Sequence, residues 1–526
     1  MGKRPTNYQL PNPLTYNLKN PNYTIYHRAA LGGLAATIQA WQDKPGLAPQ
    51  GIRAQVCEDA VEISWDSSLA LQEVIQRLLK ASFLLTENKL IDLPGQGIPP
   101  DRNDLRLAIH TGLCGTFLQH NKMRPGEKAP RALSVRDEGD ENASIFTYKA
   151  VNAYAHQTAQ GTGLLDAKLN GELPQTASIP QSIVPGAMSG ATGLEGPPED
   201  VLLLLYLMVG SAVFLLRPQT YRDKAQYCLV VPDVTNLKRF AVNLREIAAY
   251  GTNLMRFTNT YLGRVVGGAE EAALRFLIDL QAGDLTEEFE RCVSGCLAIA
   301  MGKVAWDKNQ VNRSQVVRVK GNYPEIGVFR AAAQHFSRAR IVTSKEGASF
   351  AVPQSPLPEL VAANLAAERH WCAHFIDLCK EQQDFTNLKF QKGGLAAMNK
   401  AIKDADDQTI VNVFHEAWRL TMGALGERAR KDGLDFSRLI EVERERVRNA
   451  ILRAKTADAL ASWFLRFCAD ATRGASLSAM RHDTNRIREF IFNRRNFERF
   501  QNLCLFALVS YSAEEAKNHT QGEPEA

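Results

Sequence analysis

The chain has 526 residues, of which 45% are hydrophobic and 23% charged, and this ordinary globular composition excludes a disordered or fibrous protein. At roughly 100–200 residues per domain, the length predicts two to four domains. A net charge of +5 is too small to indicate a nucleic-acid-binding protein by itself, so the position of the charges carries more information than their sum.

The first third of the chain mixes helical and extended patterns. Helical spacing is found at residues 26–41, 69–85 and 104–117, and residues 55–65 alternate as in a strand or hairpin. Two polar stretches rich in turn residues, 121–147 and 172–198, predict a surface hairpin or long loops. Long loops in a compact chain are usually functional or mobile, so both are candidate contact regions.

One apolar run tests whether the chain enters a membrane. Residues 201–216 are 16 uncharged, apolar residues, whereas a bilayer span needs about 20. The run follows a helix-start signature, Pro197-Pro198-Glu199-Asp200, and Pro218 limits its continuation. We therefore expect a buried core helix. No secretory signal is expected either, because the basic start is followed by no apolar run.

The middle of the chain also mixes strands and helices. We expect strands at 226–231 and 316–319, helices at 236–249, 269–280, 287–301, 324–337 and 357–379, and a hinge at Lys392-Gly393-Gly394.

After the hinge, helical periodicity dominates. Residues 409–430, 436–453, 457–471 and 485–510 predict four helices with short connections, which is the pattern of an antiparallel bundle. The sequence thus predicts an α+β protein: a mixed α/β body over residues 1–394, a helical bundle over 395–512 and an acidic, disordered tail over 513–526.

Patterns that indicate catalysis are absent from the sequence. It has no GxxxxGK[ST], GxGxxG or GxSxG motif and no CxxC pair. The best metal candidate is His370 with His374, but Trp371 stands where a metalloprotease has its glutamate, and no third ligand is evident. We expect no cofactor, no metal and no enzymatic activity. The nine scattered cysteines indicate buried free thiols in a reducing, cytoplasmic compartment.

Positive charge is concentrated between residues 301 and 345, a stretch that contains nine basic residues and only two acidic ones. With aromatic residues interleaved, this pattern fits a surface that binds a nucleic-acid backbone, although a solvated face is the alternative. The candidate backbone contacts are Lys303, Lys308, Arg313, Arg318, Lys320, Arg338 and Arg340.

A second basic pattern lies in the last predicted helix. Arg481, Arg488, Arg495 and Arg499 recur at spacings of 7, 7 and 4, which forms roughly one stripe if the helix extends back to Arg481. Arginine suits bidentate contacts to phosphate. The alternative is ion pairing with neighbouring helices, for which Glu441, Glu443 and Glu445 are available. Pairing of Arg444, Arg446 and Arg448 within their own helix is an equal alternative for those residues.

Three stretches together resemble a known family. They are YHRAALGGL at 26–34, LVVPDVTNLKRF at 229–240 and RRNF at 494–497, the last before a hydrophobic helix. In this order they resemble the large subunit of type I CRISPR surveillance (Cascade) complexes, of the myxobacterial DevT or Cmx type. The resemblance covers nearly the whole chain, and none of its motifs is catalytic.

The resemblance implies a non-enzymatic, RNA-guided role in antiviral defence or in transposition. Such subunits read the protospacer-adjacent motif (PAM) of double-stranded DNA, promote R-loop formation and hold the displaced strand in their helical bundle, while the guide reads the sequence. Implied partners are CRISPR RNA, target DNA, the backbone, Cas-five-type and guide-processing subunits, and either a helicase-nuclease or a TniQ-type transposition adaptor. The alternative is a helical scaffold without DNA contact.

The family's motif-reading residues do not transfer, because that loop diverges between members. From polarity and turn content we expect the reading loop to contain Asn121, Lys122, Arg124, Lys128 and Arg131. Arg28, in the first motif, either contacts RNA or a neighbouring subunit or serves in capping and core packing.

An internal translation start is also expected. Lys392-Gly393-Gly394 is encoded by AAR-GGN-GGN, which can spell a ribosome-binding sequence, and Met398 follows at a suitable distance. Related systems make a small subunit from within the large-subunit gene. Residues 398–526 are therefore expected to be made as a separate bundle that lines the displaced strand in extra copies.

Overall fold

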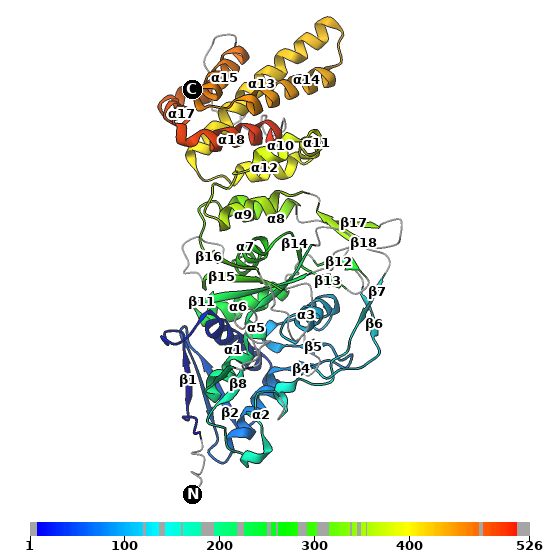
Figure 1. Ribbon diagram of the computed structural model, residues 1–526, viewed down its shortest axis with the longest axis vertical. Helices are drawn as coiled ribbons and strands as arrows, with labels where there is room; N and C mark the ends of the chain where they lie inside the picture. Colours follow the sequence, from blue (N-terminus) through cyan, green and yellow to red (C-terminus); the bar gives the residue numbers. More distant parts are fainter. Residues whose placement is uncertain are drawn as a thin grey trace. The chain divides into compact units, whose positions relative to one another are not determined.

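The computed structural model divides the chain into two compact units. Unit 1 is Met1–Asn322 with Ala339–Val352, and unit 2 is Tyr323–Arg338 with Pro353–Ala526. The described residues are 8–118, 123–135, 143–158, 161–179, 194–217, 226–249, 254–258, 261–281, 292–301, 315–336, 339–343, 349–353, 355–472 and 477–512. The sheets lie in unit 1, and unit 2 is helical, so the α+β prediction is confirmed (Figure 1).

The core of unit 1 is a five-stranded sheet covered by helices. Its order is β14 (Val265–Val266), β10 (Ala212–Leu216), β11 (Gln226–Val234), β15 (Val293–Ala300) and β16 (Gln315–Lys320). Strand β11 is central and nearly continuous in apolar residues, as expected for a strand covered on both faces. Helix α1 (Ile25–Asp43) packs on β11 and on α6 (Leu237–Ala249), and α7 (Ala269–Leu280) packs on β15.

Two glycines allow α1 to approach its neighbours closely. A Cβ on Gly33 would lie 2.2 Å from the carbonyl oxygen of Tyr206, and one on Gly210 would lie 1.9 Å from that of Ala29. These separations are far below van der Waals contact, so the positions require glycine. The YHRAALGGL motif therefore has a packing role.

The rest of unit 1 surrounds this core. Its other elements are β1 (Leu14–Asn17), β2 (Ile52–Val56) and β3 (Ala60–Trp65) in one antiparallel sheet, the helices α2 (Leu71–Ser82), α3 (Asn103–Gly115), α4 (Pro198–Leu205) and α5 (Leu207–Gly210), and the two-stranded pairs β4 (Leu84–Leu85) with β5 (Ile91–Asp92), β6 (Arg131–Val135) with β7 (Ser144–Tyr148), β8 (Ala177–Ile179) with β9 (Leu194–Gly196), β12 (Met255–Thr258) with β13 (Tyr261–Gly263), and β17 (Ala339–Thr343) with β18 (Ser349–Pro353).

Two expectations for unit 1 are wrong and one is confirmed. The apolar run 201–216 is not one helix. It contains the C-terminal part of α4, all of α5 and the sheet strand β10. The predicted helix 287–301 contains β15 instead, because its small and apolar residues pair with β11 and β16 on either side. Residues 55–65 do form a hairpin, β2–β3. No helix among the described residues is long and apolar enough to span a membrane.

Unit 2 is built around its last helix. Its helices are α8 (Ile326–Phe336), α9 (Leu357–Ala366), α10 (Phe375–Lys380), α11 (Gln382–Lys389), α12 (Lys392–Lys400), α13 (Ala405–Asp432), α14 (Phe436–Arg453), α15 (Ala457–Ala471), α16 (Ser478–His482), α17 (Thr484–Ile491) and α18 (Phe497–Ser510). Helix α18 is buried along its whole length from Phe500 to Ser510 and packs against α13, α14 and α15.

Two expectations for unit 2 are corrected. Lys392 and the two glycines that follow it open helix α12 and do not form a hinge. The predicted fourth helix is interrupted between α17 and α18, where the side chain of Asn493 accepts a hydrogen bond from the Arg495 backbone and starts a single 3₁₀ turn, η5 (Arg494–Asn496). The tail 513–526 lies outside the described residues.

Candidate nucleic-acid interface

Three of the five residues expected to read the PAM lie in described parts of the chain. Lys128 is exposed, and among the described residues it has no ion pair. Arg131 is held by Glu127, which accepts two hydrogen bonds of 2.8 and 2.6 Å from its guanidinium. Arg124 is half-buried and its Nε donates to the carbonyl oxygen of Leu118 at 2.6 Å. Asn121 and Lys122 lie outside the described residues.

Two further lysines lie beside Lys128 and were not expected from the sequence. The backbone N–H of Glu127 donates to the carbonyl of Ala150, and that of Val151 donates to the carbonyl of Lys89. These bonds bring Lys89 and the exposed Lys149 close to Lys128. We call Lys89, Lys128 and Lys149 the lysine cluster. No local pattern links them, because backbone pairing between distant segments brings them together.

A buried histidine anchors the segment that carries Lys149. His110 Nδ1 accepts a hydrogen bond from the Ile91 backbone at 3.0 Å, and its Nε2 donates to the Lys149 carbonyl at 2.9 Å. Acceptance at Nδ1 requires the neutral ring, with the proton on Nε2. Burial lowers the pKa of His110 to about 4, so the ring is neutral at physiological pH.

Of the second group of predicted residues, Arg318 and Lys320 have described side chains. They lie on one face of the edge strand β16, opposite Leu297 and Gly295 of β15, and both are exposed. Among the described residues Arg318 has no ion pair. Arg340 lies in β17, but its side chain is not described, and Lys303, Lys308, Arg313 and Arg338 lie outside the described residues.

The expected arginine stripe on one continuous helix is wrong. Arg481 belongs to α16, Arg488 to α17, Arg495 to η5 and Arg499 to α18. Arg481, Arg488 and Arg495 are exposed, and within the described part of the chain Arg488 and Arg495 form no ion pair.

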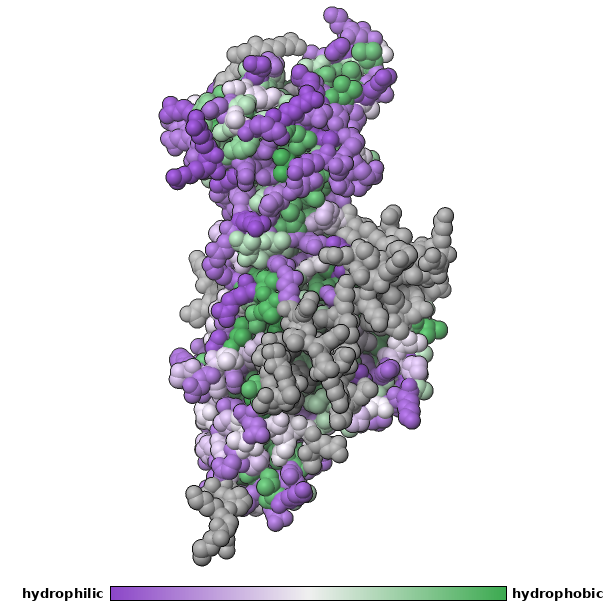
Figure 2. All heavy atoms as spheres, in the orientation of Figure 1, coloured by the Kyte–Doolittle hydropathy of each residue, from purple (hydrophilic) through white to green (hydrophobic). Residues whose placement is uncertain are grey.

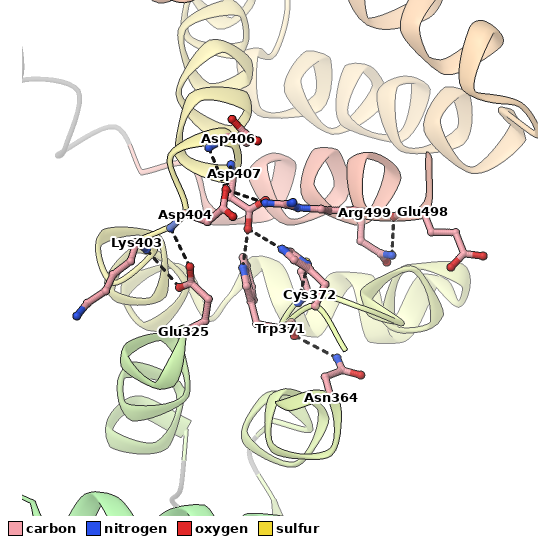
Figure 3. A network of polar contacts seen from close by, with 12 residues as sticks. Glu325, Asn364, Trp371, Cys372, Lys403, Asp404, Asp406, Asp407, Glu498 and Arg499 are labelled. Atoms are coloured by element: carbon pink, nitrogen blue, oxygen red, sulfur yellow. Dashed lines mark hydrogen bonds and ion pairs between the residues drawn. The ribbon is translucent and has the colours of Figure 1, made fainter. Parts of the chain in front are cut away.

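Arg499 is internal to unit 2 (Figure 3). Its guanidinium donates to Asp407 Oδ1 at 2.8 Å and pairs with Asp404 at 2.7 Å. Burial opposes the charge on Arg499, but the carboxylates of Asp407 and Asp404 raise its pKa above the usual value. Asp407 is fully buried and also accepts from His370 Nε2 at 2.6 Å and from Trp371 Nε1 at 2.8 Å. This network joins the start of α13 to α18, so it is structural.

The same network corrects the expectation about His370 and His374. The two residues do not share a helix, because α9 ends at Ala366 and His374 precedes α10 in a left-handed conformation with φ of 61°. The Nε2 atom of His370 is engaged by Asp407. Among the described residues, no group of three or more His, Cys, Asp or Glu side chains could hold a metal ion.

The glutamates of α14 pair within their own helix. Arg444 contacts Glu441 at 2.6 Å, Arg446 contacts Glu443 at 2.6 Å and Arg448 contacts Glu445 at 2.9 Å, each three residues apart. These three arginines are therefore paired within their own helix, which confirms the alternative given for them in the sequence analysis.

Arg28 packs inside unit 1. It forms an ion pair with Asp233, and its Nη1 donates to the Tyr23 carbonyl at 2.8 Å. The contact joins the first two family-like motifs, one on α1 and the other on β11, and it supports the packing role of Arg28.

Comparison with known proteins gives three matches. Residues 15–205 match the DevT N-terminal domain, and residues 398–526 match the DevT C-terminal domain. The chain is also 28% identical over 488 residues to the CRISPR-associated protein Cas8a1/Csx13 of Myxococcus xanthus (strain DK1622), an alignment that covers 86% of this chain and 81% of that protein.

Proposed function

This chain belongs to the DevT family of CRISPR-associated Cas8-type large subunits, and from that premise we propose that it binds target DNA without catalysis of its own. In a guide-RNA complex, the lysine cluster and the neighbouring loop would contact the PAM-bearing duplex. Unit 2 would hold the displaced strand through Arg488 and Arg495. Guide pairing would supply sequence recognition, so the protein needs only phosphate contacts and a short motif reader.

The observation that carries this proposal is a set of exposed basic side chains that, within the ranges that the structure describes, are not paired with acidic side chains of the same chain. Arg131, Arg446 and Arg499 are each engaged by carboxylates. Lys128, Arg318, Arg488 and Arg495 are exposed and, in the described part of the chain, have no acidic partner. Uncompensated surface cations release counterions when they meet phosphates, which gives salt-dependent affinity.

Binding of a target duplex by the reconstituted complex at several salt concentrations tests the proposal. Changing Arg488 and Arg495 together to alanine should lower the slope of log affinity against log salt by about 2, one for each lost phosphate contact. The control is Arg77→Ala, because Arg77 is paired with Glu73 at 2.6 Å. An unchanged slope in the double variant would contradict the assignment.

A second candidate is a scaffold that contacts only other proteins. It is favoured by the local pairing of Arg444, Arg446 and Arg448 in α14 and by the internal position of Arg499. The salt titration separates the two functions, since protein contacts alone leave DNA affinity unaffected by these substitutions.

The proposed partners are CRISPR RNA, target DNA and the other subunits of the complex, followed by either a helicase-nuclease or a TniQ-type transposition adaptor. Co-purification with the target-bound complex distinguishes the two effectors. We place the protein in the cytoplasm, where reducing conditions suit nine cysteines that form no disulfide, seven of them buried.

An internal product from Met398 remains part of the proposal. The match to the DevT C-terminal domain begins at this residue, and the product would contain all of α13 to α18. It would lack Trp371 and Phe375, whose rings pack edge-on against Phe506 with centroids 5.0 and 5.7 Å apart. We expect Met398→Leu to remove a band of about a quarter of the full length (129 of 526 residues); persistence of that band would refute the internal start.

A further inference from the structure

Unit 2 contains an open groove between three of its helices. Its volume is about 500 Å³. Among the described residues it is lined by Thr421, Ala424, Leu425 and Arg428 of α13, by Glu443, Arg446, Val447 and Ala450 of α14, and by Trp463, Arg466, Phe467, Asp470 and Ala471 of α15. The Trp463 ring stacks on Phe467 with an interplanar angle of 8°.

The α13–α14 hairpin is longer than helix α15, which packs against it. Helix α13 has 28 residues and α15 has 15, which at 1.5 Å per residue are about 42 and 22 Å long. The far end of the hairpin therefore extends beyond α15 (Figure 1). Leu434, Phe436 and Val442 are exposed there by 44%, 42% and 62%, and hydrophobic residues are visible among hydrophilic ones at that end in Figure 2.

The charges of the groove are unevenly compensated. Arg446 donates to Glu443 at 2.6 Å, and the charge of Asp470 also raises the pKa of Arg446, so both acids face this one arginine. Arg466, on the opposite wall, has no ion pair within the described residues. Arg428 reaches only Asp432, at 3.6 Å, with both side chains well exposed. Within the described residues, Arg466 thus has no ion pair, and Arg428 has only one long, exposed pair.

We propose that this groove docks an acidic amphipathic helix of a partner protein. The apolar stripe of that helix would pack on Trp463 and Leu425, and its flanking carboxylates would pair with Arg466 and Arg428. A helix in a three-sided groove completes a four-helix arrangement, and interface cores are enriched in tryptophan and arginine. The proposal does not depend on the DNA contacts proposed above.

Site-specific photo-crosslinking in the assembled guide-RNA complex tests this inference. A benzophenone amino acid replaces the exposed Ala424, and mass spectrometry maps the crosslinked segment. We expect a segment of another protein with apolar residues at helical spacing and carboxylates beside them. The variants Trp463→Ala and Arg466→Glu should each lower the crosslink yield at least tenfold. The matched control is Phe492→Ala, an aromatic residue that is 49% exposed and does not line the groove.

Circular dichroism of each variant shows whether unit 2 remains folded, and Arg466→Glu is an exposed change that should preserve the fold. A second substitution, Ala450→Phe, blocks the groove from a half-buried position in its lining. A crosslink to DNA or RNA, no crosslink at all, or a yield insensitive to the Trp463, Arg466 and Ala450 substitutions would each overturn the proposal.

Discussion

Arg28 on helix α1 and Asp233 on strand β11 form an ion pair across 205 positions of sequence. Both side chains are largely buried, with exposures of 26% and 23%. The pair fastens the helix that begins the DevT-like pattern to the central strand of the five-stranded sheet. Its location explains why these two short motifs occur together although neither contributes chemistry.

The close contact of α1 with α5 predicts that Gly33→Ala destabilises unit 1. The new methyl group would lie 2.2 Å from the Tyr206 carbonyl oxygen, and overpacking of this kind costs about 1–3 kcal/mol. Urea unfolding followed by circular dichroism measures the change. Gly46→Ala is the control, because a Cβ there meets nothing within 4 Å. Equal midpoints for the two variants would contradict the prediction.

The position of Arg499 predicts that Arg499→Ala unfolds unit 2 at lower denaturant. Removing the guanidinium leaves the fully buried Asp407 without its cation, which costs about 3–5 kcal/mol. Arg494→Ala should have almost no effect, since Arg494 is 85% exposed and lies 3.7 Å from an exposed Asp458. A stable Arg499→Ala variant with weakened DNA binding would instead show that Arg499 contacts DNA.

Two buried histidines predict acid sensitivity of unit 1. Burial lowers the pKa of His110 to about 4 and that of His156 to about 3, against 6.5 in the unfolded chain. The unfolded state therefore binds more protons between these values. Stability should be fully present above pH 6.5 and fall as pH drops toward 4, by up to about 1.4 kcal/mol per pH unit for each histidine.

Unfolding free energies measured between pH 7 and 4.5 check this slope. His156→Phe should reduce it, because His156 lies in an aromatic environment, with its ring centroid 4.5 Å from that of Phe83. A pH dependence that is the same in the parent and in this variant would show that other groups control the acid response.

The lysine cluster predicts a difference between neighbouring cations. Lys128→Ala combined with Lys149→Ala should weaken duplex binding by the complex and lower its salt slope by about 2. Arg131→Ala should have a smaller effect, because the Arg131 guanidinium is already bound to Glu127. Electrophoretic mobility shifts at two salt concentrations measure both. A larger loss of duplex binding with Arg131→Ala would show that the DNA contact lies on strand β6 and not at the lysine cluster.

Local signals predicted the helices of unit 2 well. The expected bounds 436–453 and 457–471 agree with α14 and α15, because their N-caps are short-range: Asp435 accepts from the Ser437 backbone, and Thr456 accepts from that of Ala459. The arginine spacing continues across Asn493 and therefore predicts a single helix. The side chain of Asn493 instead starts the turn that separates α17 from α18.

Long-range contacts account for what the sequence did not predict. The sequence of strand β15 predicts a helix, because its small apolar residues suit either element. Its pairing with β11 and β16 makes it a strand. Arg499 meets a carboxylate 92 positions away, and a backbone hydrogen bond from Glu127 to Ala150 brings together the segments that carry Lys128 and Lys149. No periodicity in the chain encodes either contact. Surface arginines therefore could not be separated from internal ones without the structure.

The burial of α18 has a consequence for biosynthesis. This helix is the last element of the chain that the structure describes, and its side chains from Phe500 to Ser510 form the centre of the unit that α13, α14 and α15 enclose. A nascent polypeptide emerging from the ribosome exposes the apolar faces of those earlier helices until α18 arrives. Chaperones would thus find those apolar faces uncovered until α18 has emerged.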